Sequence, residues 1–126
     1  MKRPWYAVVW FALWGLFQAY AVSSLMRGRW TRPEPFPEEA YNALIYPDMV
    51  FIPIYLTTAG LLACGRREGG LLGLFAGGAV TYVMVYLLAL ARFEGMENLV
   101  ADGAFLALNL AAMLQLARWV VQQPAA

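Results

Sequence analysis

Histidine is absent from this chain of 126 residues, and cysteine occurs once, as Cys64. Without histidine the chain lacks the commonest metal ligand and the usual base near neutral pH, which excludes zinc hydrolysis and Ser-His-Asp catalysis within it. One cysteine can form neither an internal disulfide nor a CxxC redox pair. The sequence therefore predicts no metal site and no cofactor, and an enzyme is the least favoured class of function.

Charge is also scarce. Charged residues make up 13% of the chain and the formal net charge is +1, whereas an average soluble domain is about 25% charged. The sequence has no stripe of basic residues interspersed with aromatic residues, so we expect no positively charged surface that would attract a polyanion. We therefore expect no nucleic-acid partner.

Hydrophobic residues make up 62% of the chain and are gathered in long runs without charge, at 4–26, 49–65, 69–91 and 103–117. A membrane-spanning helix needs about 20 apolar residues, whereas apolar runs of about 10 to 14 are more typical of buried core helices. The runs predict an all-α integral membrane four-helix bundle, a single domain over 1–126, in the lipid bilayer of the cell membrane (the inner membrane if the source is bacterial). The predicted spans are 4–26, 48–65, 70–92 and 98–120.

The first run has a second interpretation. Lys2 and Arg3, the apolar stretch and the small-residue sequence AYA at 19–21 resemble a secretory signal peptide with its cleavage site. The same run contains three tryptophans, which favours a retained first span.

The distribution of charge predicts an orientation. The loops after the second and third spans are short, so we expect an up-down-up-down arrangement. Every acidic residue except Glu68 then falls on one side, while lysine and arginine divide almost evenly, with Lys2, Arg3, Arg66, Arg67 and Arg118 on the other side. The positive-inside rule places that basic side, and both termini, in the cytoplasm.

The segment 27–47 is the only long polar stretch, and four of its residues are prolines. Pro37 could open a short interfacial helix that runs through Leu44. The segment is interpreted either as an outer loop that tethers two spans or as a lid over a site at the outer ends of the helices.

A stripe of small residues marks the third span, because Gly69, Gly73, Gly77 and Thr81 recur every four residues. Membrane helices associate through close backbone packing, and such stripes mark where a neighbour approaches. The neighbour is either another helix of the same chain or, at Gly73 and Gly77, a second copy in a homodimer.

Uncharged polar side chains gather near the middle of the predicted spans. Asparagine and glutamine in hydrocarbon need hydrogen-bond partners, so this layer either joins helices or lines a small pocket for the head group of a ligand. The candidate ligand-binding residues are Gln18, Tyr55, Tyr82, Tyr86 and Asn109.

Charged residues cluster at the predicted outer side, at Asp48, Arg92, Glu94, Glu97 and Asp102. A helix N-terminus favours an anion such as Asp48, and Asp102, one turn inside its span, is expected to pair with Arg92 or water. Proton or cation coupling through Asp48 and Asp102, or an acid–base pair for chemistry on a lipid, are the functional alternatives.

The stretch PDMVFIPIYLTTAGLL, which starts at Pro47, resembles the second helix of the EXPERA-type membrane proteins, and the similarity of layout extends from Asp48 to Glu94. The resemblance implies four spans and a ligand bound between helices. The catalytic histidines of the sterol isomerases in that family have no counterpart here.

The leading hypothesis is a small polytopic membrane protein that binds or transports a small lipophilic molecule in a polar-lined pocket within the bundle. The first alternative is an accessory subunit of a larger membrane complex. The second is a lipid-modifying or isomerase-like membrane enzyme.

Overall fold

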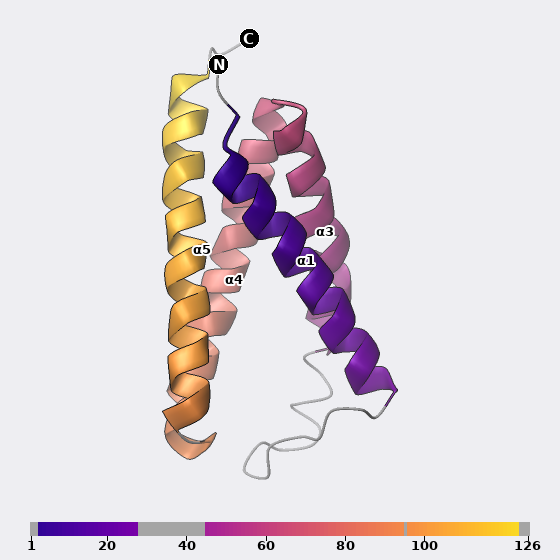
Figure 1. Cartoon of the computed structure of the whole chain (residues 1–126), viewed down its shortest axis with the longest axis vertical. Coiled ribbons are helices and arrows are strands. Elements are labelled where there is room, and N and C mark those ends of the chain that lie inside the picture. Colours follow the sequence, from indigo (N-terminus) through magenta and orange to yellow (C-terminus); the bar gives the residue numbers. More distant parts are fainter. Residues whose placement is uncertain (1–2, 28–44, 95, 124–126) are drawn as a thin grey trace.

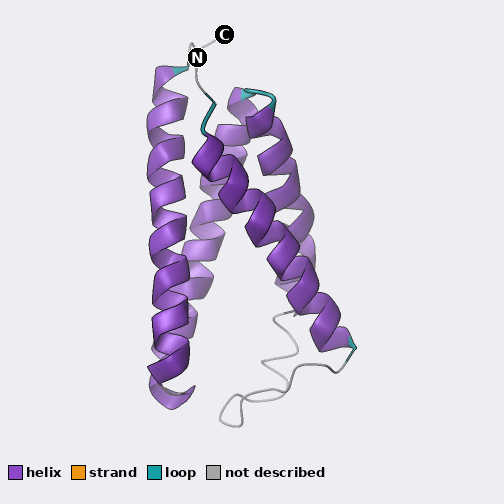
Figure 2. Cartoon of the chain, viewed as in Figure 1, coloured by secondary structure: helices purple, strands orange, loops and turns teal. Residues whose placement is uncertain are grey.

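A computed structural model describes residues 3–27, 45–94 and 96–123, and it places their side chains except those of 25, 45 and 90–99. This part of the chain forms four helices, α1 (Trp5–Met26), α3 (Ile45–Ala63), α4 (Arg67–Glu94) and α5 (Met96–Gln122), with a short turn between α3 and α4 (Figures 1 and 2). The predicted all-α class is confirmed. The central part of the segment 27–47 lies outside the described residues.

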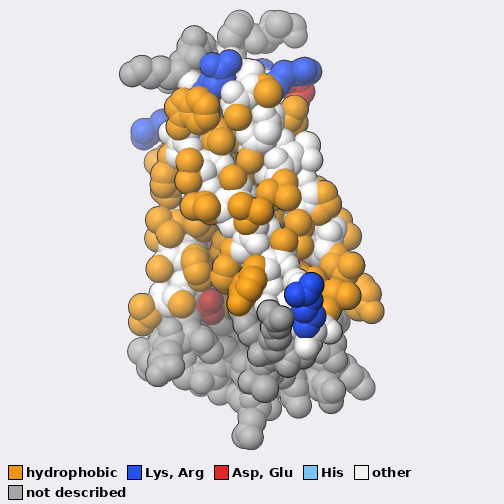
Figure 3. Space-filling model, turned by 45° about the vertical axis from the view of Figure 1, so that its right-hand side comes forward, with side chains coloured by type: hydrophobic (Ala, Val, Ile, Leu, Met, Phe, Trp, Pro, Cys, Tyr) orange, Lys and Arg blue, Asp and Glu red, His pale blue; other side chains and the backbone are white. Residues whose placement is uncertain are grey.

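All four helices are long and apolar enough to cross a membrane, at Trp5–Ser24, Tyr46–Ala63, Arg67–Ala89 and Val100–Gln122. Apolar side chains cover the middle of the face in Figure 3, and charged side chains lie toward its ends. Large apolar residues on several helices, among them Leu13, Phe75 and Val121, are exposed. The chain thus has the helices of a multi-pass membrane protein.

The second helix differs from its predicted bounds at both ends. It begins at Ile45, before Pro47, because a proline in the first turn lacks only an N–H that would have no partner within the helix. It ends at Ala63 because Gly65 adopts a φ of +74°. Gly65 N then donates to Leu62 O and Arg66 N to Leu61 O, which is the Schellman arrangement that stops a helix at glycine.

Two ends of the bundle are distinguished in Figure 1. The proximal end holds the start of α1, the α3–α4 turn and the end of α5, and the distal end holds the end of α1 and the start of α3. Helix α4 packs along α5, and α1 packs along α3. Helix α1 approaches α5 near the proximal end and diverges from it toward the distal end (Figure 1).

The core lies between all four helices. Its largest fully buried apolar side chains are Phe11, Leu62, Val80 and Leu116, one from each helix. Two polar side chains, Thr58 and Asn109, are also fully buried. The Thr58 hydroxyl donates to the Ile54 carbonyl at 2.8 Å, so it is satisfied within its own helix, whereas Asn109 joins three helices.

Candidate functional site

Asn109 lies in the middle of α5, and its amide joins α5 to α1 and α4. Trp10 Nε1 donates to Asn109 Oδ1 at 3.1 Å. Asn109 Nδ2 donates to Gly77 O and to Thr81 Oγ1, both at 3.0 Å. Thr81 in turn donates to Gly77 O at 2.8 Å. The amide of Asn109 is therefore occupied by contacts within the chain.

Two further contacts near the proximal end join α1 to α5. Ala7 N, in the first turn of α1, donates to Gln115 Oε1 at 2.9 Å, so a side chain of α5 satisfies one of the free N–H groups at that helix end. The Tyr6 hydroxyl donates to Leu108 O at 2.9 Å. Gln115 was not among the predicted site residues, and its only signal in the sequence was an amide inside the apolar run of the fourth span.

The glycine stripe of α4 lies at contacts with α3 and α5. A Cβ on Gly69 would stand 2.9 Å from Leu62 N, and a Cβ on Gly73 would stand 2.5 Å from Leu116 Cδ1. A Cβ on Gly77 would stand 2.6 Å from Met113 Cγ. All three glycines are buried, so these positions face other helices of the same chain.

Trp14, on α1, carries the one buried side-chain nitrogen or oxygen in the described part of the chain that has no hydrogen-bond partner. The residue is 5% exposed, and its Nε1 is buried. The Tyr55 hydroxyl on α3 is close enough to interact with this indole, but the two groups do not meet hydrogen-bond geometry. Trp14 therefore presents an unused donor at the middle of the bundle.

Gly15 explains how α1 comes so close to Tyr55. A Cβ at Gly15 would stand 2.8 Å from Leu56 Cδ2 and 3.2 Å from Tyr55 Cβ. The missing side chain lets the backbone of α1 lie against α3 next to Trp14.

Aromatic rings surround the unused donor. Trp14 stacks on Trp10 with ring centroids 5.3 Å apart, and it meets the edge of Phe105 from α5 at 5.4 Å. Phe17 lies 5.8 Å from Trp14 and 5.9 Å from Phe105. We call Trp14, Phe17, Tyr55 and Phe105 the aromatic site. It combines flat apolar walls with one free N–H.

The remaining predicted ligand-binding residues are not among those that form the aromatic site. Tyr82 is 76% exposed on α4 and Tyr86 is also exposed, so both point outward. Gln18 is half-buried on α1, one helical turn beyond Trp14. Of the predicted set, the structure brings only Tyr55 next to Trp14, and it buries Asn109 in contacts of its own.

The charged outer cluster is only partly described. Asp48 is half-buried in the first turn of α3. Asp102 is half-buried on α5 and takes part in an interaction. Arg92, Glu94 and Glu97 lie near the α4–α5 junction, and their side chains are outside the described residues. No group of three or more His, Cys, Asp or Glu that could hold a metal ion occurs among the residues described.

The proximal end carries basic groups. Arg66 hydrogen bonds to Glu68 at 3.4 Å, and this contact together with the negative charge of Glu68 raises the pKa of the exposed Arg66 guanidinium above its usual value. Because of this contact, Arg66 stays positively charged at any physiological pH.

A polar hollow of about 290 Å³ lies at the same end. It is lined by Arg3, Cys64, Gly65 and Gln123.

Comparisons with protein-family models, with curated proteins and with solved structures find no match to this chain.

Proposed function

We propose that this protein is an up-down-up-down membrane bundle with cytoplasmic termini that binds a small lipophilic molecule at the aromatic site. The ligand is flat and apolar, and it carries one oxygen that accepts a hydrogen bond. The observation that carries this proposal is the buried Trp14 Nε1, which makes no hydrogen bond of good geometry within the described part of the chain.

An unsatisfied buried donor costs about 1–3 kcal/mol, and lipid supplies no water that could relieve it. An acceptor oxygen brought by a ligand would remove that cost. Trp10 offers the comparison, because its N–H already donates to Asn109. We therefore assign ligand binding to Trp14, whose N–H makes no hydrogen bond within the described residues, and helix packing to Trp10, whose N–H donates to Asn109.

The surroundings suit a flat apolar body. Aromatic rings pack well against planar ligands in offset or edge-on geometry, and ligand sites are mostly apolar with a few well-placed polar groups. Phe17 contacts Trp14 and is 41% exposed at the surface, so in this proposal the ligand displaces the Phe17 ring to reach Trp14. The ligand would reach the site laterally from the membrane.

A matched pair of probes tests the proposal. In 2-isopropenylnaphthalene a methylene group (=CH2) replaces the carbonyl oxygen of 2-acetylnaphthalene, and the substituent keeps its trigonal carbon. Equilibrium dialysis of the purified protein in micelles, against empty micelles, should show that the ketone binds about 2- to 12-fold more tightly, as one hydrogen bond of about 0.5–1.5 kcal/mol allows.

Trp14→Phe should abolish this difference between the probes, whereas Trp5→Phe, at an exposed position, should preserve it. Equal binding of the two probes by the unmodified protein, or a difference that survives Trp14→Phe, contradicts the proposal.

An accessory subunit is the second candidate, and one surface favours it. Helix α5 exposes small residues on one side, at Ala101, Ala104, Ala107 and Ala111, and a Cβ on the neighbouring Gly103 would meet nothing within 4 Å. Small residues let another helix approach closely. Native mass spectrometry from mild detergent reports such a partner or a homodimer, and Ala107→Leu with Ala111→Leu should then release it.

A further inference from the structure

A cleft lies between the end of α1 and the start of α3, at the distal end of the bundle. Its volume is about 630 Å³, within the range of about 300–1,000 Å³ typical of ligand pockets. It is separate from the aromatic site, since Trp14 and Tyr55 do not line it.

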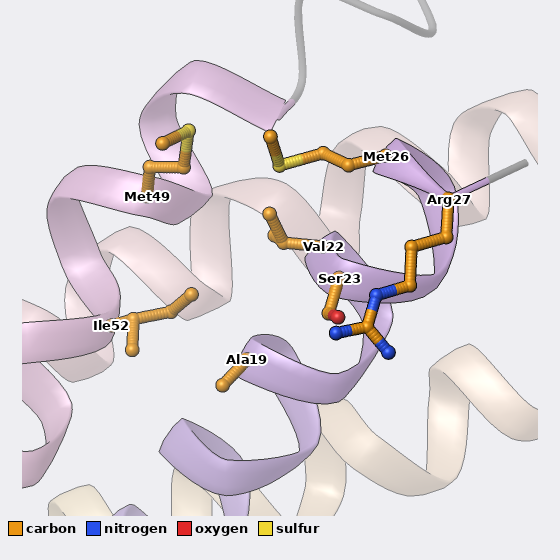
Figure 4. A pocket seen from close by; sticks show the side chains of 7 residues that line it. All are labelled: Ala19, Val22, Ser23, Met26, Arg27, Met49 and Ile52. Atoms are coloured by element: carbon orange, nitrogen blue, oxygen red, sulfur yellow. The ribbon is translucent and has the colours of Figure 1, made fainter.

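The lining of the cleft is apolar except at one rim. Val22, Met26, Met49 and Ile52 provide apolar surface, and Ser23 and Arg27 provide a hydroxyl and a guanidinium. In Figure 4, Met26 and Met49 extend toward each other across the cleft, and the Arg27 guanidinium folds back along α1 toward Ser23. The described lining contains no acidic side chain. A ligand of complementary chemistry is therefore an amphiphile with a negative head.

The position of these groups along α1 matches the layers of a bilayer. The apolar span of α1 runs from Trp5 to Ser24, so Val22 lies at the depth of acyl chains. Arg27 follows three residues after the end of the span, at the depth of the phosphate groups. In the cleft, the positive charge of Arg27 thus lies nearer the membrane surface than the apolar lining residues. A phospholipid arranges its phosphate and its acyl chains in the same order.

We propose that this cleft binds one anionic phospholipid of the surrounding bilayer. Its phosphate is held by the Arg27 guanidinium, which pairs with phosphate through two parallel hydrogen bonds, and by the Ser23 hydroxyl. One acyl chain lies between Met26 and Met49, because methionine side chains adapt to irregular apolar shapes. This proposal is independent of ligand binding at the aromatic site.

Native mass spectrometry of the protein released from nanodiscs tests the proposal. The nanodiscs contain equal amounts of dioleoylphosphatidylglycerol and dioleoylphosphatidylcholine, which share their chains and differ in head-group charge. We expect one retained phosphatidylglycerol, about fivefold in excess over phosphatidylcholine, as one basic residue near an anionic surface allows.

Arg27→Gln should remove the preference for the anionic lipid, whereas Arg118→Gln, at an exposed arginine on α5 near the proximal end, should leave it unchanged. Met49→Trp should fill the cleft and lower retention of both lipids. Arg27 is exposed and directly follows the end of α1, so its substitution should leave the fold intact, and binding of 2-acetylnaphthalene should not change.

Three results would overturn the proposal. The first is retention of the two lipids in equal amounts by the unmodified protein. The second is a preference that survives Arg27→Gln, and the third is an equal loss of preference in Arg118→Gln.

Discussion

Trp10 and Trp14 are adjacent on one face of α1, stacked on each other and both buried. Their indole nitrogens nevertheless have different surroundings. Trp10 Nε1 donates to Asn109, which is itself joined to Gly77 and Thr81 of α4. Trp14 Nε1 has no acceptor. At the scale of single residues, the first indole joins helices through Asn109, and the second makes no hydrogen bond that would join α1 to another helix.

The same substitution at these two positions separates the roles. Trp10→Phe and Trp14→Phe remove the same volume, but only Trp10→Phe leaves Asn109 Oδ1 without its donor. In the ligand-free protein we expect Trp10→Phe to lower the free energy of unfolding by about 1 kcal/mol more than Trp14→Phe. Reversible unfolding in mixed micelles measures both values, and an equal or larger loss for Trp14→Phe would show that its N–H has a partner.

At the scale of helices, glycines decide how closely α4 packs. Gly69 meets the backbone of α3, and Gly73 and Gly77 meet side chains of α5. Leucine at Gly73 and Gly77 would therefore overpack the monomer before it could test a homodimer. Gly78, which adjoins this stripe, is exposed, and a Cβ there would meet nothing within 4 Å.

Gly69→Ala and Gly78→Ala form a matched pair on one helix. The Cβ of Gly69→Ala would stand 2.9 Å from a backbone nitrogen of α3 that cannot move cheaply, so we expect a loss of about 1–3 kcal/mol in the free energy of unfolding. Gly78→Ala should cause no loss and should raise the free energy of unfolding by up to about 1 kcal/mol, because alanine favours a helix more than glycine does. Thermal unfolding followed by circular dichroism measures both, and similar losses at the two sites would contradict this packing of α4.

For the whole molecule, the proposed orientation depends on which end of the bundle faces the cytoplasm. Basic residues Arg3, Arg66 and Arg67 lie at the proximal end, and Arg66 remains charged beside Glu68. The positive-inside rule favours the cytoplasm for such an end. Cys64 lies there too and is exposed, which makes the single native cysteine a reporter.

A membrane-impermeant maleimide tests this orientation in intact cells. We expect Cys64 to be labelled only after the membrane is permeabilised. A second variant, Cys64→Ser with Glu38→Cys, moves the thiol to the segment 27–47 and should be labelled without permeabilisation. The opposite pattern of labelling would reverse the orientation.

Much of the fold could be predicted from the sequence, and less of the candidate site. The apolar runs located all four helices to within a few residues, and Asn109 and Tyr55 were identified as polar residues near the middle of the spans. Trp14 was not among the predicted site residues, because the sequence alone does not distinguish an indole at helical spacing beside Trp10 and Phe17 from a packing residue. Whether its N–H finds an acceptor depends on side chains from other helices.

The sequence by itself determined that this chain forms four helices long and apolar enough to span a membrane, because bilayer thickness sets the length of an apolar run. Only the tertiary structure decided which faces are inside. Gly77 is buried and Gly78 exposed, and Tyr55 is buried while Tyr82 points outward. Lipid is as apolar as a packed helix interface, so hydrophobicity does not distinguish these faces, and close contacts between the helices do.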